Sequence, residues 1–311
     1  MRIVFMGTPE FAVPSLEQLV TNRHQVWGVY TQPDRLSGRG QHPLAPPLKR
    51  VAQGLGLPVY QPASLKEKVT VAEIAALGPD VIVVAAYGQI LPQTVLDIPR
   101  LGAINLHPSL LPRYRGAAPV AAAILAGERF TGVSVMLMET GLDCGPVLSQ
   151  AQVAIADSDT TATMTDKLSR VGAGMLGEVL GSWSRGELIP RPQDESRASY
   201  SRAITKDDGE ISWQMPARDI WRRVRAYQPW PGSFTRWQGK RLNIIAAAPA
   251  GERASGEAGR VVALAGDAFG VQTGEGVLAV LQVQLEGKRV MSGAEFLRGQ
   301  RHLAGARLPR D

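Results

Sequence analysis

Three polar side chains follow apolar runs at positions that suit acyl-transfer chemistry. In AINLHPSLLPRYRG (103–116), Asn105 and His107 stand two residues apart, at the end of a short β-like run. If the extended backbone continues, both side chains point to the same side. An Asn amide and a His N–H are donors that stabilise an oxygen on which negative charge develops during a reaction.

Asp143 is a candidate third member of this set. It lies in MLMETGLDCGP (136–146), in a turn bracketed by glycines after another apolar run. A carboxylate there can pair with His107 and relay protons. Taken singly, the Asn is typical of a turn cap and the His of a satisfied polar residue, but all three at strand ends of one sheet favour a catalytic set.

Other chemistries have less support in the sequence. Cys144 adjoins Asp143, and a neighbouring anion disfavours the thiolate, so we expect a packing role. There is no G-x-S-x-G motif, and the four histidines (His24, His42, His107, His302) lack metal-ligand spacing, so we expect no metal. The single cysteine excludes an internal disulfide and fits a reducing cytoplasm. We expect no leader before RIVFMG and no membrane span, since no apolar run reaches about 18 residues.

The first half of the chain alternates strand-like and helix-like segments. Strands are predicted at 2–7, 24–31, 80–87, 131–139 and 146–156, and helices at 9–20, 116–128 and 161–183. The continuous apolar run DVIVVAAY (80–87) is typical of a central parallel strand covered on both faces. This order predicts a doubly wound α/β sheet, in which ligands bind at the carboxyl ends of the strands. MGTPEF (6–11) lacks the nucleotide fingerprint G-x-G-x-x-G, so it predicts a tight turn.

The chain changes character near 185–210, where a polar, Pro-containing stretch predicts a linker or a long crossing segment. A basic helix is then predicted at 216–227, and short β-rich runs split by glycines indicate a small antiparallel barrel. Residues 201–311 hold 17 Lys and Arg against 11 Asp and Glu, whereas residues 1–200 hold 17 of each, so the whole excess of +6 lies in the last third. This excess is either a solubilising surface or a docking surface for a polyanion.

A second basic feature is the long segment 31–50, TQPDRLSGRGQHPLAPPLKR. Most connections after a strand take about 2–6 residues, so this one is unusually long. Its four cations are opposed by a single acid, Asp34, and two glycines flank the central one; the cations are Arg35, Arg39, Lys49 and Arg50. The segment is either a disordered insertion or a mobile loop that lays a guanidinium against a phosphate.

INLHPSLLPRYRGAAP together with TGLDCGP resembles the formyltransferases that use 10-formyltetrahydrofolate. The resemblance extends over nearly the whole chain, and the opening MRIVFMGTPEFAVPSLEQL with the insertion PDRLSGRG is similar to the branch that acts on methionyl initiator tRNA. It implies a Rossmann-like catalytic domain over 1–188, a linker over 189–208 and an OB-like β-barrel that binds tRNA over 209–311. It further implies a folate co-substrate, no metal, a cytoplasmic location and, by default, a monomer.

The same resemblance implies roles for individual residues. Asn105, His107 and Asp143 match the catalytic set of the family. The positions expected to contact folate are the signature from Ser109 to Gly116 and two turns, namely Tyr87, Gly88, Gln89, Ile90, Leu91, Ser109, Leu110, Leu111, Pro112, Tyr114, Gly116, Gly141 and Leu142. The positions expected to contact tRNA are Arg35, Arg39, Lys49, Arg50, Arg222, Arg223 and Arg225.

The expected reaction is transfer of a formyl group from the folate to the α-amine of methionine on initiator tRNA. Two alternatives stay open at this point. One is a formyltransferase that acts on the amine of a sugar nucleotide. The other is a non-catalytic RNA-binding protein, which has no need of an intact Asn, His and Asp set.

Overall fold

The computed structural model describes residues 1–37, 42–251, 256–300 and 302–309. These residues form two compact units. Unit 1 comprises Met1–Pro119, Phe130–Ala154 and Met164–Ser201, and unit 2 comprises Val120–Arg129, Ile155–Thr163 and Arg202–Asp311, apart from the residues outside the described ranges.

The core of unit 1 is a seven-stranded sheet in the order β10-β9-β7-β6-β1-β2-β5. Five of its strands, β1, β2, β5, β6 and β7, pair in parallel. At one edge β9 pairs antiparallel with β7, and β10 pairs antiparallel with β9. This confirms the predicted mostly parallel α/β sheet. The strands are β1 (Arg2–Gly7), β2 (Gln25–Tyr30), β5 (Val59–Tyr60), β6 (Val81–Ala85), β7 (Ala103–His107), β9 (Phe130–Leu137) and β10 (Val147–Ala154).

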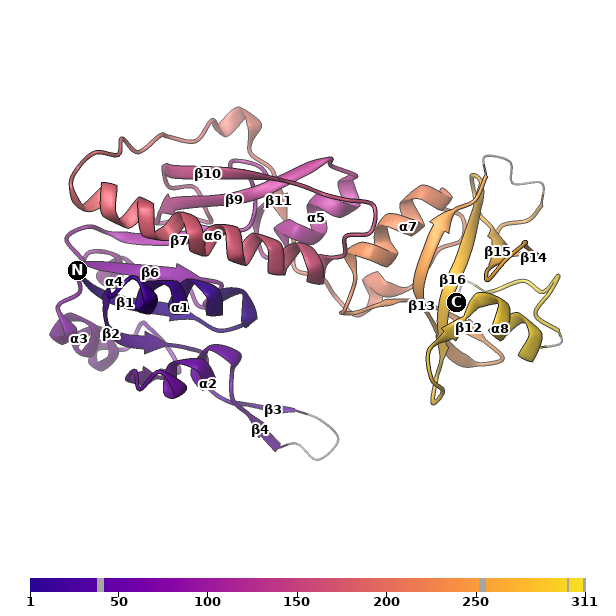
Figure 1. Ribbon diagram of the computed structural model, residues 1–311, viewed down its shortest axis with the longest axis horizontal. Helices are drawn as coiled ribbons and strands as arrows, with labels where there is room; N and C mark the ends of the chain where they lie inside the picture. The colour runs from indigo at the N-terminus through magenta and orange to yellow at the C-terminus, as the bar shows by residue number, and fades with distance from the viewer. Residues whose placement is uncertain (38–41, 252–255, 301, 310–311) are drawn as a thin grey trace. The chain divides into compact units, whose positions relative to one another are not determined.

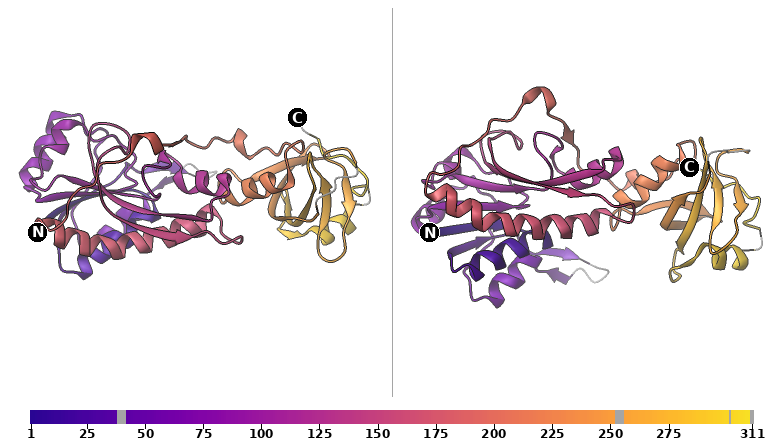
Figure 2. Two further views of the ribbon diagram at one scale, coloured as in Figure 1. Left: turned by 90° about the horizontal axis from the view of Figure 1, so that it is seen from above. Right: turned by 45° about the horizontal axis from the view of Figure 1, so that its top comes forward.

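Helices cover both faces of this sheet (Figures 1 and 2). On one face α3 (Lys68–Leu77) and α4 (Gln93–Leu96) contribute Ile74, Val95 and Leu96 to a core with alternate residues of β1 and β6. On the other face lie α1 (Val13–Thr21) and α6 (Thr161–Ser184), which run close enough that Nδ2 of Asn22 lies 2.6 Å from the place of a Cβ on Gly177.

The central strand and the first turn follow from their sequences. All five residues of β6 are buried, as expected for a parallel strand covered on both faces. The first turn needs Gly7 because a Cβ there would lie 2.9 Å from the main-chain oxygen of Ala85 on the neighbouring strand. A 3₁₀ turn, η1 (Glu10–Ala12), precedes α1, so the helix predicted from residue 9 begins at Val13.

The long segment 31–50 is partly ordered rather than a single loop. It contains the strand pair β3 (Arg35–Ser37) and β4 (His42–Leu44), and α2 (Pro47–Gly54) begins within it. Pro47 at the first position of α2 suits a helix start, because proline lacks only an N–H that would be unpaired there. Residues 38–41 at the tip lie outside the described residues.

The segment predicted as a linker is divided between the units. Residues 189–201 pack within unit 1 through main-chain pairing of β11 (Tyr200–Ser201) with β8 (Arg115–Gly116) and of Arg191 with Val147. The 3₁₀ turn η2 (Glu195–Arg197) lies between these two contacts. Residues 120–129, mostly in α5 (Pro119–Ala126), and 155–163 group with unit 2, although both fall within the predicted catalytic domain.

Unit 2 contains an antiparallel sheet, curled into a half-barrel, together with α7, α8 and most of α5. The strand order is β12-β13-β16-β15-β14, with β17 beside β16, and this confirms the expected antiparallel second domain. Its core includes Ile220 and Val224 of α7 and Phe296 of α8. The elements are η3 (Asp207–Gly209), α7 (Ala217–Ala226), β12 (Ser233–Trp237), β13 (Lys240–Pro249), β14 (Val261–Ala263), β15 (Phe269–Gln272), β16 (Val277–Leu285), β17 (Met291–Ser292) and α8 (Gly293–Gly299).

Candidate active site

Strand β7 presents Asn105 and His107 on the same face of the sheet, because side chains alternate along a strand. Between them Leu106 points the other way, toward α6, where its Cδ2 lies 3.0 Å from the place of a Cβ on Gly172. The register pairs Asn105 with Met136 and His107 with Ser134 of β9. The chain needs this alternation to place two polar side chains on one face while the strand packs on α6.

Asp143 comes from the loop after β9 and lies beside both side chains. Its Oδ2 accepts a hydrogen bond from the main-chain N–H of Gly116 at 2.8 Å and lies 3.5 Å from Nδ1 of His107. Its Oδ1 lies 3.5 Å from Nδ2 of Asn105. Asp143 has a φ of 51°, in the left-handed region that glycine favours, and this backbone turn directs the carboxylate toward β7. The structure therefore brings the three predicted catalytic residues together.

The hydrogen-bond partners of His107 determine which ring nitrogen carries the hydrogen. Nε2 lies 3.0 Å from the carbonyl oxygen of Tyr114, which can only accept, so Nε2 donates. In the neutral ring Nδ1 then has a lone pair, and this lone pair faces the carboxylate of Asp143. Burial lowers the pKa of His107 below its usual 6.5, against the opposing effects of the Asp143 carboxylate and the Tyr114 carbonyl. The His107–Asp143 pair can therefore bind one additional proton, between Nδ1 of the ring and Oδ2 of the carboxylate.

The signature turn 109–116 contacts His107 and Asp143 through its main chain. Ser134 Oγ donates to the carbonyl of Ser109 and accepts from the N–H of Leu111, while Ser109 Oγ donates to the carbonyl of Arg113. These bonds fix the turn so that its main chain offers the Tyr114 carbonyl to His107 and the Gly116 N–H to Asp143. Five residues of the predicted folate set do not line the cavity described below but build this turn, namely Ser109, Leu110, Leu111, Pro112 and Tyr114.

A cavity of about 600 Å³ opens beside the three side chains, within the range typical of small-molecule sites. The predicted positions that line it are Tyr87, Gly88, Gln89, Ile90, Leu91, Asn105, His107, Gly116, Gly141, Leu142 and Asp143. Tyr87 is buried, and burial raises the pKa of its hydroxyl to about 12. The side chain of Gln89 bonds to the main chain of Leu65 and Pro62, so this residue faces the 62–65 loop. Lining residues that the sequence did not single out include Ala86, Met136, Met138, Glu139, Thr140 and Ser201.

A buried arginine connects the signature turn to the Asp143 loop. Arg115 is 1% exposed, and its guanidinium contacts Glu195 and Gln193. Gln193 in turn donates to the carbonyls of Asp143 at 2.8 Å and Gly145 at 2.7 Å. Sequence reasoning missed Gln193 and Glu195 because they lie in a polar stretch without periodicity, and no local signal marks a partner about 80 residues away.

The cations of segment 31–50 differ in their availability. Arg35 is exposed, and Arg50 is 61% exposed at 3.7 Å from Glu10. Lys49 binds both oxygens of Asp34 at 2.8 Å. Arg39 lies outside the described residues.

The three predicted arginines of α7 also have different surroundings. Arg225 is buried and donates to the carbonyls of Asp159 and Ala156, so it fastens the 155–160 segment to the helix. Arg222 pairs with Asp219 at 3.1 Å, and Arg223 donates to the carbonyl of Asp208 at 3.2 Å. The structure therefore gives Arg225 a packing function that its position in the sequence does not reveal.

The described part of the chain contains no cluster of three or more His, Cys, Asp and Glu side chains arranged to hold a metal ion. It also contains no helix long and apolar enough to span a membrane.

The sequence matches a class of enzyme that transfers a formyl group. Residues 1–180 match the formyl transferase family and residues 203–301 match the formyl transferase C-terminal domain, so the chain belongs to the formyltransferase family. It is 50% identical over 310 residues to a methionyl-tRNA formyltransferase of Dehalococcoides mccartyi, covering 99% of this chain and 98% of that protein. It is 48% identical over 300 residues to a methionyl-tRNA formyltransferase of Chloroflexus aurantiacus, covering 96% and 97%.

Solved structures with lower sequence identity share the fold. HypX from Aquifex aeolicus, solved in complex with tetrahydrofolic acid, has a TM-score of 0.65 at 20% identity, covering 96% of this chain and 47% of that one. The sugar 3N-formyl transferase WlaRD, solved with dTDP and 5-N-formyl-THF, has a TM-score of 0.66 at 18% identity, covering 93% and 99%. At these identities the likeness establishes the fold alone.

Proposed function

We propose that this chain transfers the formyl group of 10-formyltetrahydrofolate to the α-amine of methionine esterified to initiator tRNA. The observation that carries the proposal is Asp143, which lies within 3.5 Å of both Asn105 and His107 at the wall of a cavity of about 600 Å³. The relatives of about 50% identity, matched over nearly their whole length, support the choice of methionyl-tRNA as the acceptor.

The cavity suits a folate. Two glycines, Gly88 and Gly141, line it, and glycine lets a flat ring approach the peptide groups closely, while Ile90, Met138 and Leu142 supply apolar surface. When bound, the folate supplies a formyl group on N10 that is activated for attack by an amine. The residues expected to hold it are the lining members of the predicted folate set.

The polar side chains have separate roles in this proposal. The Asn105 amide donates to the formyl oxygen as negative charge develops there; loss of one such donor typically costs about 10²–10³ in rate. The His107–Asp143 pair takes up the proton that the attacking amine releases, because Nδ1 of the ring and Oδ2 of the carboxylate lie 3.5 Å apart and can share one proton. Asp143 stabilises the charged ring and keeps it oriented, and the proton then passes to the departing nitrogen.

The tRNA contacts are proposed from charge and exposure. Arg35 and Arg50 are exposed in the described part of segment 31–50, and Arg39 stays a prediction from the sequence. Unpaired, splayed nucleotides are the usual targets of RNA-reading proteins, and the acceptor end of a tRNA provides them. A cytoplasmic, monomeric enzyme is part of the same proposal.

A competition assay tests the proposed acceptor. The full chain is incubated with 10-formyltetrahydrofolate and methionyl initiator tRNA, with and without an excess of a dTDP-linked amino sugar. We expect formyl-methionyl-tRNA to form at a rate that the sugar does not reduce. Formylation of the sugar but not of the tRNA contradicts the proposal, as does tRNA binding without any formyl transfer.

A further inference from the structure

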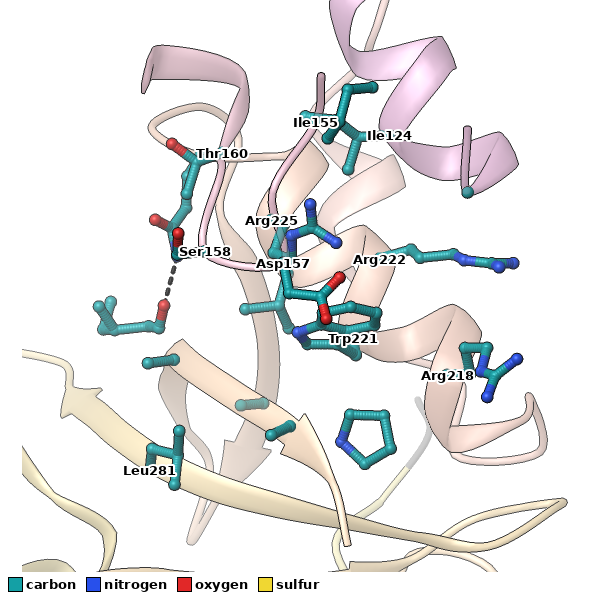
Figure 3. Close-up of a pocket in the computed structure, with 18 of the residues that line it drawn as sticks. Ile124, Ile155, Asp157, Ser158, Thr160, Arg218, Trp221, Arg222, Arg225 and Leu281 are labelled. Atoms are coloured by element: carbon teal, nitrogen blue, oxygen red, sulfur yellow. Dashed lines mark hydrogen bonds between the residues drawn. The ribbon is translucent and has the colours of Figure 1, made fainter. Parts of the chain in front are cut away.

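A second cavity, of about 940 Å³, lies within unit 2 and is separate from the candidate active site. Its walls come from helix α7, strands β13 and β16, the 155–160 segment and the end of α5 with residues 127–129. In Figure 3, Trp221 of α7 lies near the centre, with Asp157 and Arg225 above it, while Arg218 and Arg222 project to one side. Nothing in the proposed chemistry uses this cavity.

Helix α7 has two different faces. Ala217, Ile220 and Val224 are buried in the core of unit 2. Four other residues line the cavity, at helical spacings of i, i+3, i+4 and i+7, which place them on one face: Arg218, Trp221, Arg222 and Arg225. The helix is thus held by its apolar face and presents three arginines and an indole to the cavity.

Two of these arginines are already engaged. Arg225 lies over the Trp221 ring at 4.5 Å and donates to two main-chain carbonyls, which fixes the indole in the wall. Arg222 pairs with Asp219. Both side chains are therefore part of the wall and are held by partners within unit 2.

Two other cations remain available at the rim. Arg218 and Arg129 both line the cavity and are exposed, and no side-chain hydrogen bond or ion pair is described for either within the described residues. Opposite α7, Ala246, Ala248 and Leu281 form an apolar wall in which Leu281 is 40% exposed. The cavity therefore combines an aromatic and apolar interior with four arginines, which outnumber the two acids of its lining, Glu128 and Asp157.

We propose that this cavity binds one unpaired nucleotide of the RNA substrate, with its base against Trp221 and the apolar wall and its phosphate at Arg129 and Arg218. Aromatic rings and guanidinium groups are the side chains on which unpaired bases stack. The carboxylate of Asp157 lines the same cavity and can accept hydrogen bonds from base or ribose donors, and it disfavours the clustered negative charge of a free polyphosphate. This inference rests on the proposed function.

Three cavity variants and one control test the site. Arg129→Ala/Arg218→Ala removes the rim charge, Ala248→Leu fills the interior, and Leu281→Ser changes the wall at an exposed position. Arg260→Ala/Arg298→Ala removes the same charge from exposed positions of unit 2 outside the cavity. For each, the Kd for methionyl initiator tRNA is measured by filter binding at several salt concentrations, and kcat is measured at saturating tRNA. Thermal unfolding confirms that each variant folds.

We expect each cavity variant to raise Kd by about tenfold or more with kcat unchanged, and the charge variant to lower the slope of log K against log salt by about 1 per lost phosphate contact. The control pair should change Kd less than twofold. Equal effects of the two arginine pairs overturn the proposal, and so does an unchanged Kd in the folded Ala248→Leu and Leu281→Ser variants.

The outcome is separable from that of the proposed function. If the wild-type chain forms no formyl-methionyl-tRNA, the proposed function fails. The proposal that the cavity binds a nucleotide is still tested by the Kd values of the variants for the same tRNA without methionine. Excess AMP as competitor shows whether a free nucleotide replaces the RNA. Competition by AMP at concentrations comparable to the tRNA overturns the choice of an RNA chain as the occupant.

Discussion

Gln193 fixes the main chain of the loop that carries Asp143, because its Nε2 donates to the carbonyl of Asp143 at 2.8 Å. The same nitrogen donates to Gly145, and the Oε1 of Gln193 accepts from Arg115. Arg115 belongs to the turn that contacts His107 and Asp143, so one carboxamide connects both supports of the catalytic set. Gln193 is therefore a positioning residue of the site.

Gln193→Leu should lower kcat by about 10- to 100-fold, because a small displacement of a reacting group is costly. KM for both substrates should change little, since Gln193 does not line the cavity. Steady-state kinetics measure the split, and Gln152→Leu, the same change at an exposed position of β10, is the control. Normal kcat with only a lower Tm would show that Gln193 is structural alone.

The ionisation of His107 gives a prediction about pH. Burial lowers its pKa, so the neutral ring should persist below pH 6.5 and gain a proton only on further acidification. Replacing Asp143 by Asn removes the carboxylate that raises this pKa, so the midpoint should move further down. NMR titration of the ring nitrogens, assigned with a His107→Gln spectrum, measures both midpoints and should show the hydrogen on Nε2. A midpoint above 6.5 contradicts the argument.

The Arg115–Glu195 pair should matter more for stability than an ion pair between two exposed side chains. Arg115 is 1% exposed, so removal of Glu195 leaves a buried charge with neutral contacts such as Gln193 but without this carboxylate. Glu195→Ala should therefore lower Tm clearly, whereas Glu187→Ala, which breaks a pair with the exposed Arg185, should have little effect. Calorimetry measures Tm for both variants, and equal values of Tm would contradict the greater importance of the Arg115–Glu195 pair.

Residues whose environment follows from local pattern were predictable. The buried β-branched run of β6 and the alternation of Asn105, Leu106 and His107 on β7 both indicate where polar side chains meet a covered sheet. The glycine-bracketed turn around Asp143 is equally visible. These features of the sequence are enough to predict that Asn105, His107 and Asp143 lie at one site.

Other features depend on partners distant in the sequence. Arg222, Arg223 and Arg225 are alike in the basic helix, and only packing makes Arg225 a buried contact to the 155–160 segment. The stretch 189–201 lacks periodicity because its main chain pairs with the signature turn, and its side chains face different neighbours. Neither result follows from composition or spacing.

The most direct test of the central claim is the single-turnover rate of formyl transfer to methionyl initiator tRNA by Asp143→Asn. Asparagine keeps an oxygen that can accept from the Gly116 N–H but removes the charge beside His107. The account predicts a rate at least about 100-fold below wild type, with the Kd for tRNA and Tm unchanged. A rate within twofold of wild type would contradict it.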